Sequence, residues 1–128
     1  MNPWVDYELA ALKKRWPDLE HTADSNWVIL PNYKVPEGWD KSEAKVAFQT
    51  PNLPGEKPYA FWVEGGLLLP ENKTPASYAY PDTSCPLPGQ WGKFSWELDP
   101  WAPGNKPGEG TGMVNFVQSF GNRLREMG

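Results

Sequence analysis

The chain is poor in the residues that carry most enzyme chemistry, because its 128 residues include one cysteine, Cys85, and one histidine, His21. A single thiol cannot form an internal disulfide, so we expect a fold held by packing in a reducing compartment. His21 stands in a polar stretch and lacks the companions that a metal site needs, so we expect a solvated surface residue. The sequence therefore predicts neither a metal ion nor a cofactor.

Long apolar runs and basic clusters are also missing. Apolar runs such as residues 67–69 are far too short to cross a bilayer. Residues 1–4 carry neither the basic nor the apolar region of a secretory signal. The net charge is −4, and the twelve Lys and Arg are spread along the chain, whereas nucleic-acid binding usually needs a basic patch. We expect a cytoplasmic protein with neither a membrane nor a nucleic-acid partner.

Proline and tryptophan, by contrast, are plentiful. The chain has fifteen prolines and eight tryptophans. Proline-rich chains are often disordered, but disordered chains lack aromatic residues. We therefore expect an ordered protein with long proline-punctuated loops packed under large aromatic side chains. The length fits a single domain over residues 1–128, large enough to bury one core.

Two amphipathic segments predict a helix near each end of the chain. Asn2 can cap a helix that has Pro3 at its first position, and Pro17 ends the pattern. The second helix is expected to begin near Met113, with Thr111 as its cap. The apolar stripes that carry these predictions are Val5, Leu9, Leu12 and Trp16 in the first segment, and Met113, Phe116, Val117, Phe120 and Leu124 in the second.

Three β-prone segments lie between the helices. Residues 27–30 form an apolar run bounded by Pro31, residues 44–48 alternate apolar and polar side chains, and residues 59–63 end at a pair of glycines. Each is expected to be a strand.

Residues 70–110 contain repeated prolines and are expected to be mostly irregular, with short strands near residues 67–69 and 94–98. A helix, a run of strands, a long loop region and a second helix together predict an α+β fold. We expect an antiparallel β-meander with an N-terminal and a C-terminal helix and a long Pro/Trp-rich loop region.

Cys85 is the first candidate for chemistry. It lies among polar residues and prolines in residues 82–88, so we expect an exposed loop thiol. A nucleophilic thiol also needs its pKa lowered by a nearby cation, a helix start or a base. None lies within five residues of it along the chain. Residue chemistry alone favours an incidental loop cysteine over a nucleophile.

Three further patterns have a functional and a structural interpretation. Residues 108–112 are glycine-rich but lack the lysine of a phosphate loop, which favours a linker. Glu97 and Asp99 would share one face of a strand, as acid–base pairs do, but solvated charges are the simpler interpretation. Trp4, Trp16, Trp27 and Trp62 fit a core, whereas Trp91, Trp96 and Trp101 leave open an aromatic platform for a ligand such as a sugar.

The order of several motifs resembles that of ubiquitin-conjugating domains. Residues 45–51 read Lys-Val-Ala-Phe-Gln-Thr-Pro, and a proline-rich hinge and the β-prone residues 59–63 follow. The Trp-x-Pro motif that precedes the C-terminal helix in those domains is matched by residues 101–103.

The bacterial family E branch of that superfamily is more similar still. Its Val-Pro-Glu-Gly segment is matched by residues 35–38, its Gly-Leu-x-Leu segment by residues 66–69, and its closing Trp-x-Pro-Gly by residues 101–104. The resemblance covers about residues 5–125. It implies a role in conjugating a ubiquitin-like protein, with Cys85 as the thioester nucleophile. The implied partners are a ubiquitin-like protein, a ThiF-like adenylating activating enzyme and a JAB-type peptidase.

The chain departs from that family at the site of catalysis. Residues 64–66 read Glu-Gly-Gly where active enzymes carry His-Pro-Asn, and Asn72 is the nearby residue that could replace the missing oxyanion donor. The family's cysteine lies about eight residues before the Trp of Trp-x-Pro; here that position is Lys93, and Cys85 lies sixteen residues before Trp101. Three hypotheses stay open: a thioester-carrying enzyme, a non-catalytic variant or adaptor, and an unrelated aromatic-rich ligand-binding domain.

Overall fold

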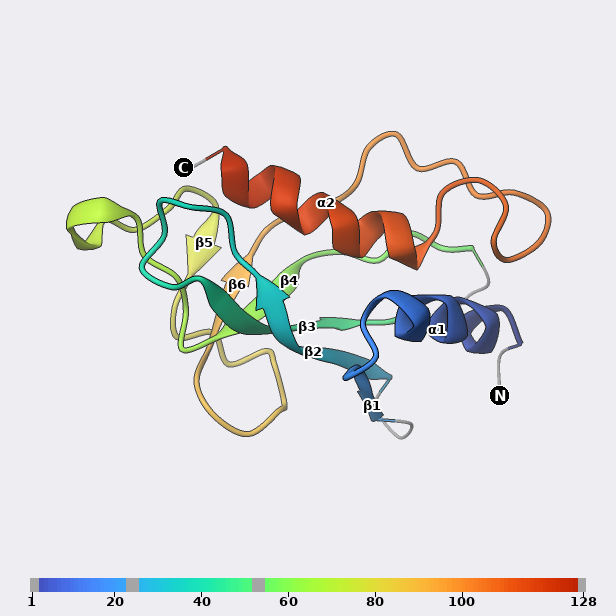
Figure 1. Ribbon diagram of the computed structural model, residues 1–128, viewed down its shortest axis with the longest axis horizontal. Coiled ribbons are helices and arrows are strands. Elements are labelled where there is room, and N and C mark those ends of the chain that lie inside the picture. Colours follow the sequence, from blue (N-terminus) through green and yellow to red (C-terminus); the bar gives the residue numbers. More distant parts are fainter. Residues whose placement is uncertain (1–2, 23–25, 52–54, 127–128) are drawn as a thin grey trace.

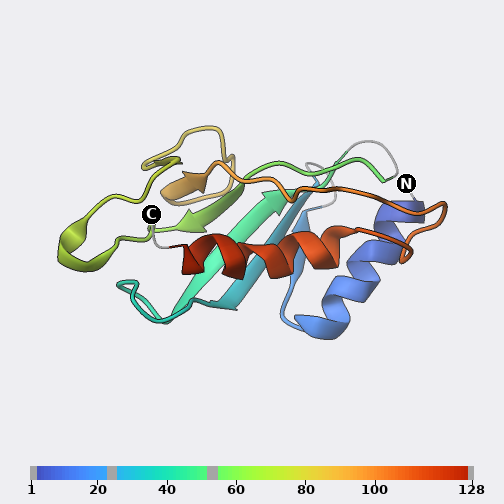
Figure 2. The same cartoon turned by 90° about the horizontal axis from the view of Figure 1, so that it is seen from above.

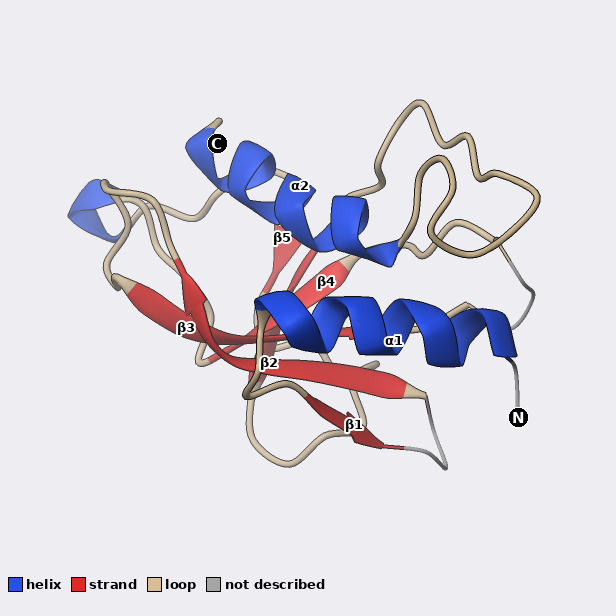
Figure 3. Cartoon of the chain, turned by 45° about the vertical axis from the view of Figure 1, so that its right-hand side comes forward, coloured by secondary structure: helices blue, strands red, loops and turns tan. Residues whose placement is uncertain are grey.

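The computed structural model describes residues 3–22, 26–51 and 55–126. Every strand pairing is antiparallel, and the strands form one sheet in the order β1-β2-β3-β4-β6-β5. Both helices lie on one face of this sheet (Figures 1 and 3), which confirms the predicted α+β fold. The elements are α1 (Pro3–Arg15), β1 (Glu20–Thr22), β2 (Trp27–Lys34), β3 (Glu43–Gln49), β4 (Phe61–Glu64), the short 3-10 helix η1 (Pro70–Asn72), β5 (Tyr78–Ala79), β6 (Trp91–Phe94) and α2 (Met113–Arg125).

The strands follow meander order except at one edge. β6 lies between β4 and β5, with Trp62 opposite Lys93 on one side and Ala79 opposite Lys93 on the other. The sequence placed a strand over residues 94–98, whereas β6 lies a few residues earlier. β1 and β5 were missed, because strands of two or three residues have too few positions to show an alternating pattern.

The predicted ends of two strands were wrong. β2 continues beyond Pro31, and its pairing with β3 shifts between Leu30 and Tyr33. Such a β-bulge accommodates a proline, which has no N–H to donate to the neighbouring strand. β4 begins at Phe61 rather than at residue 59, because Ala60 adopts a left-handed backbone with φ of 69°. The expected strand at residues 67–69 is absent; Leu69 makes an isolated bridge to Lys73 instead.

Phenylalanine rings form the centre of the core between the sheet and the helices. Phe61 of β4 stacks on Phe120 of α2 with ring centroids 4.1 Å apart, and on Phe94 of β6 at 5.0 Å. Phe48 and Phe116 meet edge to face at 5.4 Å. All five rings are fully buried. Losing one such ring typically costs about 3–5 kcal/mol of stability, so this cluster holds α2 on the sheet.

Polar side chains fix the position of α2 along the sheet. The Tyr33 hydroxyl donates to the Val117 carbonyl at 2.7 Å, and the Trp39 indole N–H donates to the Leu124 carbonyl at 2.8 Å. The segment between β6 and α2 runs back along that helix (Figure 2), where the Trp96 indole donates to the Ser119 hydroxyl at 2.9 Å. The rings of these large aromatic residues thus pack in the core, while their O–H and N–H groups donate hydrogen bonds to residues of α2.

A carboxylate near the other end of the chain accepts a hydrogen bond from a backbone N–H at the start of α2. The Met113 N–H donates to the Glu8 carboxylate of α1 at 3.0 Å. Gly112 precedes the helix, and a side chain there would collide with that carboxylate. Thr111, the predicted cap, instead accepts a hydrogen bond from the Ala102 N–H at 3.2 Å. Asn2, the predicted cap of α1, lies outside the described residues.

Burial raises the pKa of Glu8, and the hydrogen bonds from Met113 and Trp4 oppose that shift. A raised pKa means that the folded chain binds a proton which the unfolded chain has already released. The contribution of Glu8 to stability is therefore lost as the pH rises through its folded pKa. We expect Glu8→Gln, which keeps an acceptor oxygen, to gain stability relative to the wild type as the pH rises from 4 to 7, measured by urea unfolding.

Glu8→Ala provides the comparison. It removes the acceptor and leaves the Met113 N–H without a partner, which should cost about 1–3 kcal/mol at every pH. A Glu8→Gln variant whose stability relative to the wild type does not change with pH would contradict this account of Glu8.

Candidate functional site

Residues 80–90 cover the face of the sheet that the helices leave open. Figure 1 shows this loop on the side of the sheet opposite α2. Beneath it lies a second apolar cluster, distinct from the core under the helices, which we call the outer cluster. Its buried members are Trp27, Ala47, Ala60, Trp62, Cys85 and Trp91, with Ile29 and Leu87 packed against them.

Asp82 holds the covering loop in place. Its carboxylate accepts hydrogen bonds from the Trp62 indole at 3.1 Å and from the Ser84 N–H at 3.0 Å, and from the Ser84 hydroxyl. Burial alone would raise the pKa of Asp82, but these hydrogen bonds and the charge of Lys93 together hold it below its usual value. At the other end of the loop the Trp91 indole donates to the Pro88 carbonyl at 3.1 Å. The loop is thus tied to β4 and β6.

Cys85 is buried within this arrangement. Only 8% of its surface is exposed, so the prediction of an exposed loop thiol was wrong. The residues around it in the sequence are polar, but the loop folds back onto the tryptophans of the sheet. Burial raises the pKa of the Cys85 thiol, a hydrogen bond from the Leu87 backbone opposes that shift, and the charge of Asp82 adds to it. Such a thiol stays protonated near neutral pH and is a poor nucleophile.

The residues that could assist a thiol are engaged with other groups, lie outside the outer cluster or are not described. Lys93, the position where the resemblance places the catalytic cysteine, lies within β6. Its ammonium lies over the rings of Trp62 and Tyr59, 5.5 and 5.8 Å from their centroids. His21 is exposed in β1 and is not part of the outer cluster. The backbone of Asn72 ends η1, and its side chain lies outside what the structure describes.

Residues 64–66, which stand where active enzymes carry His-Pro-Asn, allow close packing at the edge of the sheet. Gly65 and Gly66 both have positive φ, and the Gly65 N–H donates to the Gln90 carbonyl at 2.8 Å. A side chain on Gly66 would collide with the hydroxyl of Tyr78. That hydroxyl accepts a hydrogen bond from the Leu67 N–H at 3.0 Å. The two glycines therefore allow a close approach of β4, β5 and the residues that follow β4.

The later tryptophans also act as structural residues. The Trp101 indole donates to the Gly55 carbonyl at 2.8 Å, and Trp96 and Trp101 are half-buried against the core under the helices. Trp91 is buried in the outer cluster. Their rings and N–H groups are engaged, which argues against an aromatic ligand platform. Glu97 is exposed and pairs with Lys57 at 3.4 Å, and residues 97–99 lie outside any strand, so Glu97 and Asp99 do not share the strand face that was expected.

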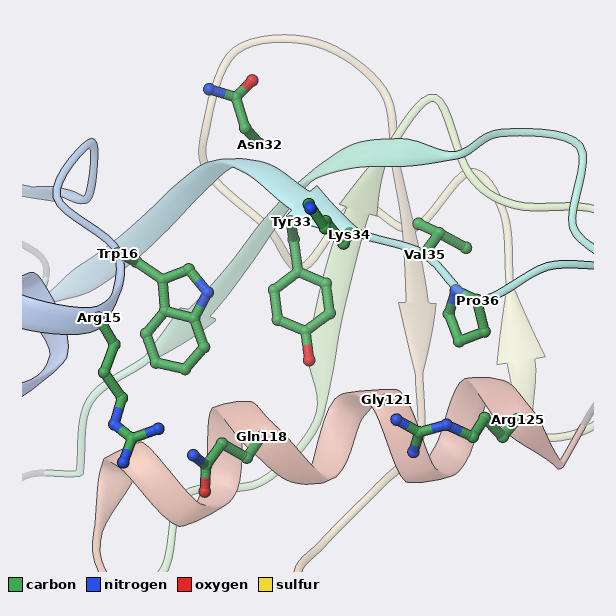
Figure 4. Close-up of a pocket in the computed structure, with 10 residues that line it drawn as sticks. All are labelled: Arg15, Trp16, Asn32, Tyr33, Lys34, Val35, Pro36, Gln118, Gly121 and Arg125. Carbon is green, nitrogen blue, oxygen red and sulfur yellow. The ribbon is translucent and has the colours of Figure 1, made fainter.

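One feature of the surface was missed in the sequence. Arg15, Lys34 and Arg125 line a single groove, although they come from α1, β2 and α2 (Figure 4). The basic last turns of the two helices are visible in the sequence, but they also occur wherever cations stabilise helix ends. Only the packing of α1 and α2 on one face of the sheet brings these residues together.

Among the described residues, no three His, Cys, Asp or Glu side chains gather where they could hold a metal ion. No helix within the same part of the chain is long and apolar enough to cross a membrane. Comparisons with protein-family models, with curated proteins and with solved structures found no match to this chain.

The burial of Cys85 predicts slow thiol chemistry. We expect native protein at pH 8 to react with iodoacetamide at least about tenfold more slowly than the same chain in denaturing urea, because the thiol is shielded and protonated. Mass spectrometry of timed samples measures the rate. Equal rates in the two states would show that the loop does not protect the thiol.

Leu87→Ala tests whether the covering loop is responsible. Leu87 packs against the outer cluster, so its removal should accelerate alkylation of Cys85. Leu98→Ala is the matched control, because Leu98 is also partly buried but packs against the core under the helices.

Proposed function

We propose that this protein is a binding module of a ubiquitin-like conjugation pathway, a ubiquitin-conjugating-like domain that carries no thioester. The observation that carries the proposal is the burial of Cys85 in the outer cluster with a raised thiol pKa. Unlike the hypothesis of a thioester-carrying enzyme, this proposal requires no chemistry from that residue. The proposal includes a cytoplasmic location, because a single thiol stays reduced in that compartment.

The order of elements supports the link to the pathway. The resemblance implies an N-terminal helix, an antiparallel meander and a helix after the Trp-x-Pro motif. The described chain has α1, then β1 to β4, then η1, β5 and β6, and then α2, which begins ten residues after Pro103. The motif segments at residues 45–49 and 61–63 lie within β3 and β4. Fold alone does not specify activity, so the family link rests on these motifs.

The chemistry of transfer argues against catalysis by Cys85. Thioester exchange needs a thiolate that attacks the incoming acyl carbonyl while the activating enzyme's thiolate leaves, together with a donor for the oxyanion. Cys85 is buried, and burial raises the pKa of its thiol. The segment at residues 64–66 offers glycines in place of His-Pro-Asn. A module that binds without reacting needs neither group.

Reconstitution separates binding from transfer. The assay mixes the protein with ATP and with a ubiquitin-like protein and a ThiF-like adenylating enzyme encoded in the same gene neighbourhood. We expect no thiol-sensitive adduct on a non-reducing gel. Calorimetry should detect binding to one of the two proteins, with an affinity that Cys85→Ala changes by less than about twofold, since the thiol is buried.

Three outcomes would overturn the proposal. A thiol-sensitive adduct that disappears in Cys85→Ala would make the protein a conjugating enzyme. A gene neighbourhood without such proteins, or the absence of binding to both of them, would remove it from the pathway.

A further inference from the structure

A groove of about 650 Å³ lies between the end of α1, the end of β2 and α2. Arg15 from the last turn of α1 lies at one end and Arg125 from the last turn of α2 at the other (Figure 4). Trp16 and Tyr33 lie between them. We call this feature the basic groove and define it by Arg15, Trp16, Tyr33, Lys34, Gln118 and Arg125.

The charge of the groove is opposite to that of the whole protein. The chain carries a net charge of −4, yet three cations and no carboxylate line the groove. Both ion pairs among the described residues, Lys45–Glu64 and Lys57–Glu97, lie elsewhere. The Arg125 guanidinium donates to the neutral Asn122 side chain at 2.9 Å. These cations are therefore not neutralised by ion pairs within the described chain.

The floor of the groove is aromatic and rigid. Trp16 stacks on Tyr33 with ring centroids 6.4 Å apart, and Tyr33 is buried with its hydroxyl bound to the Val117 carbonyl. Burial raises the pKa of Tyr33 to about 12, although the Gly121 backbone and the Arg125 charge oppose that shift. The phenol is thus neutral at physiological pH and adds no negative charge beneath the cations.

A second hollow of about 460 Å³ lies along α1 and has Arg15 as a lining residue in common with the groove. Lys14 adds another cation there, and Tyr7, which is 54% exposed, adds another aromatic ring. Its single carboxylate, Glu8, is buried and already accepts from the Met113 N–H. Two neighbouring hollows with cations in both suit an extended ligand with several negative charges better than a small anion.

We propose that the basic groove binds an extended acidic segment of a partner protein. Arginine binds carboxylates through paired N–H donors and is less strongly hydrated than lysine, so Arg15 and Arg125 are suited to hold two acidic side chains. The Trp16 ring offers an apolar surface for an aromatic side chain between them. This inference rests on the groove alone and does not depend on the proposed pathway.

Fluorescence anisotropy with a labelled Glu-Glu-Phe-Glu-Glu peptide tests the proposal. We expect saturable binding to the wild type that weakens as salt is added. Arg15→Glu combined with Arg125→Glu should weaken it at least about tenfold, because both carboxylate partners become repulsive. Lys73→Glu combined with Lys106→Glu is the matched control, since it makes the same change in net charge at exposed sites outside the groove. It should change the affinity less than about twofold.

NMR amide shifts locate the site and report on folding. In the wild type the peptide should perturb amides of residues 15–16, 33–35 and 118–125, and the Arg15→Glu and Arg125→Glu variant should keep a folded spectrum. No binding by the wild type, equal losses in the two double variants, or shifts confined to other residues would overturn the proposal. So would a peptide with Gln in place of Glu that binds equally well, or inorganic phosphate that displaces the peptide at similar concentrations.

Discussion

The central strands present apolar side chains on both faces of the sheet, so both faces have to be covered. Because successive side chains in a strand point to opposite sides, Phe61 and Val63 of β4 meet the helices while Trp62 faces the other way. The helices can cover only one face. The loop of residues 80–90 covers the other, and its position follows from the need to remove Trp27 and Trp62 from water.

This second layer decides the chemistry of the only thiol. Cys85 lies in the covering loop. The tryptophans in its cluster, Trp27, Trp62 and Trp91, lie in strands of the sheet. Among its polar neighbours in sequence, Asp82 accepts hydrogen bonds from the Ser84 N–H and from the Trp62 indole. Cys85, which the sequence pattern places on the surface, thus becomes part of the outer cluster, and burial raises its pKa.

The first layer creates the remaining surface features. α1 and α2 are joined by the hydrogen bond between Glu8 and the Met113 N–H, and Tyr33 and Trp39 fix α2 against β2 and the segment that follows it. Because these contacts bring the C-terminal turns of both helices to one side of β2, their arginines face a common groove. Its charge results from helix docking, because the basic last turns of the two helices do not by themselves show that they meet.

Much of the fold was predictable because helix stripes and strand alternation are local patterns. The two helices, the fold class and the segments of β2, β3 and β4 were found in this way, although Pro31 lies within β2 instead of ending it. The bulge that admits this proline depends on pairing with β3, which local patterns do not encode.

The candidate site was less predictable. The sequence identified Cys85 as the only thiol, the absence of His-Pro-Asn and the glycines at residues 65 and 66. Only the tertiary structure decided that the thiol is buried, that Lys93 lies over Trp62 and Tyr59, and that Arg15 and Arg125 share a groove. Residue type sets which chemistry is available. Burial and proximity, which depend on contacts between distant parts of the chain, decide which of it the folded protein can use.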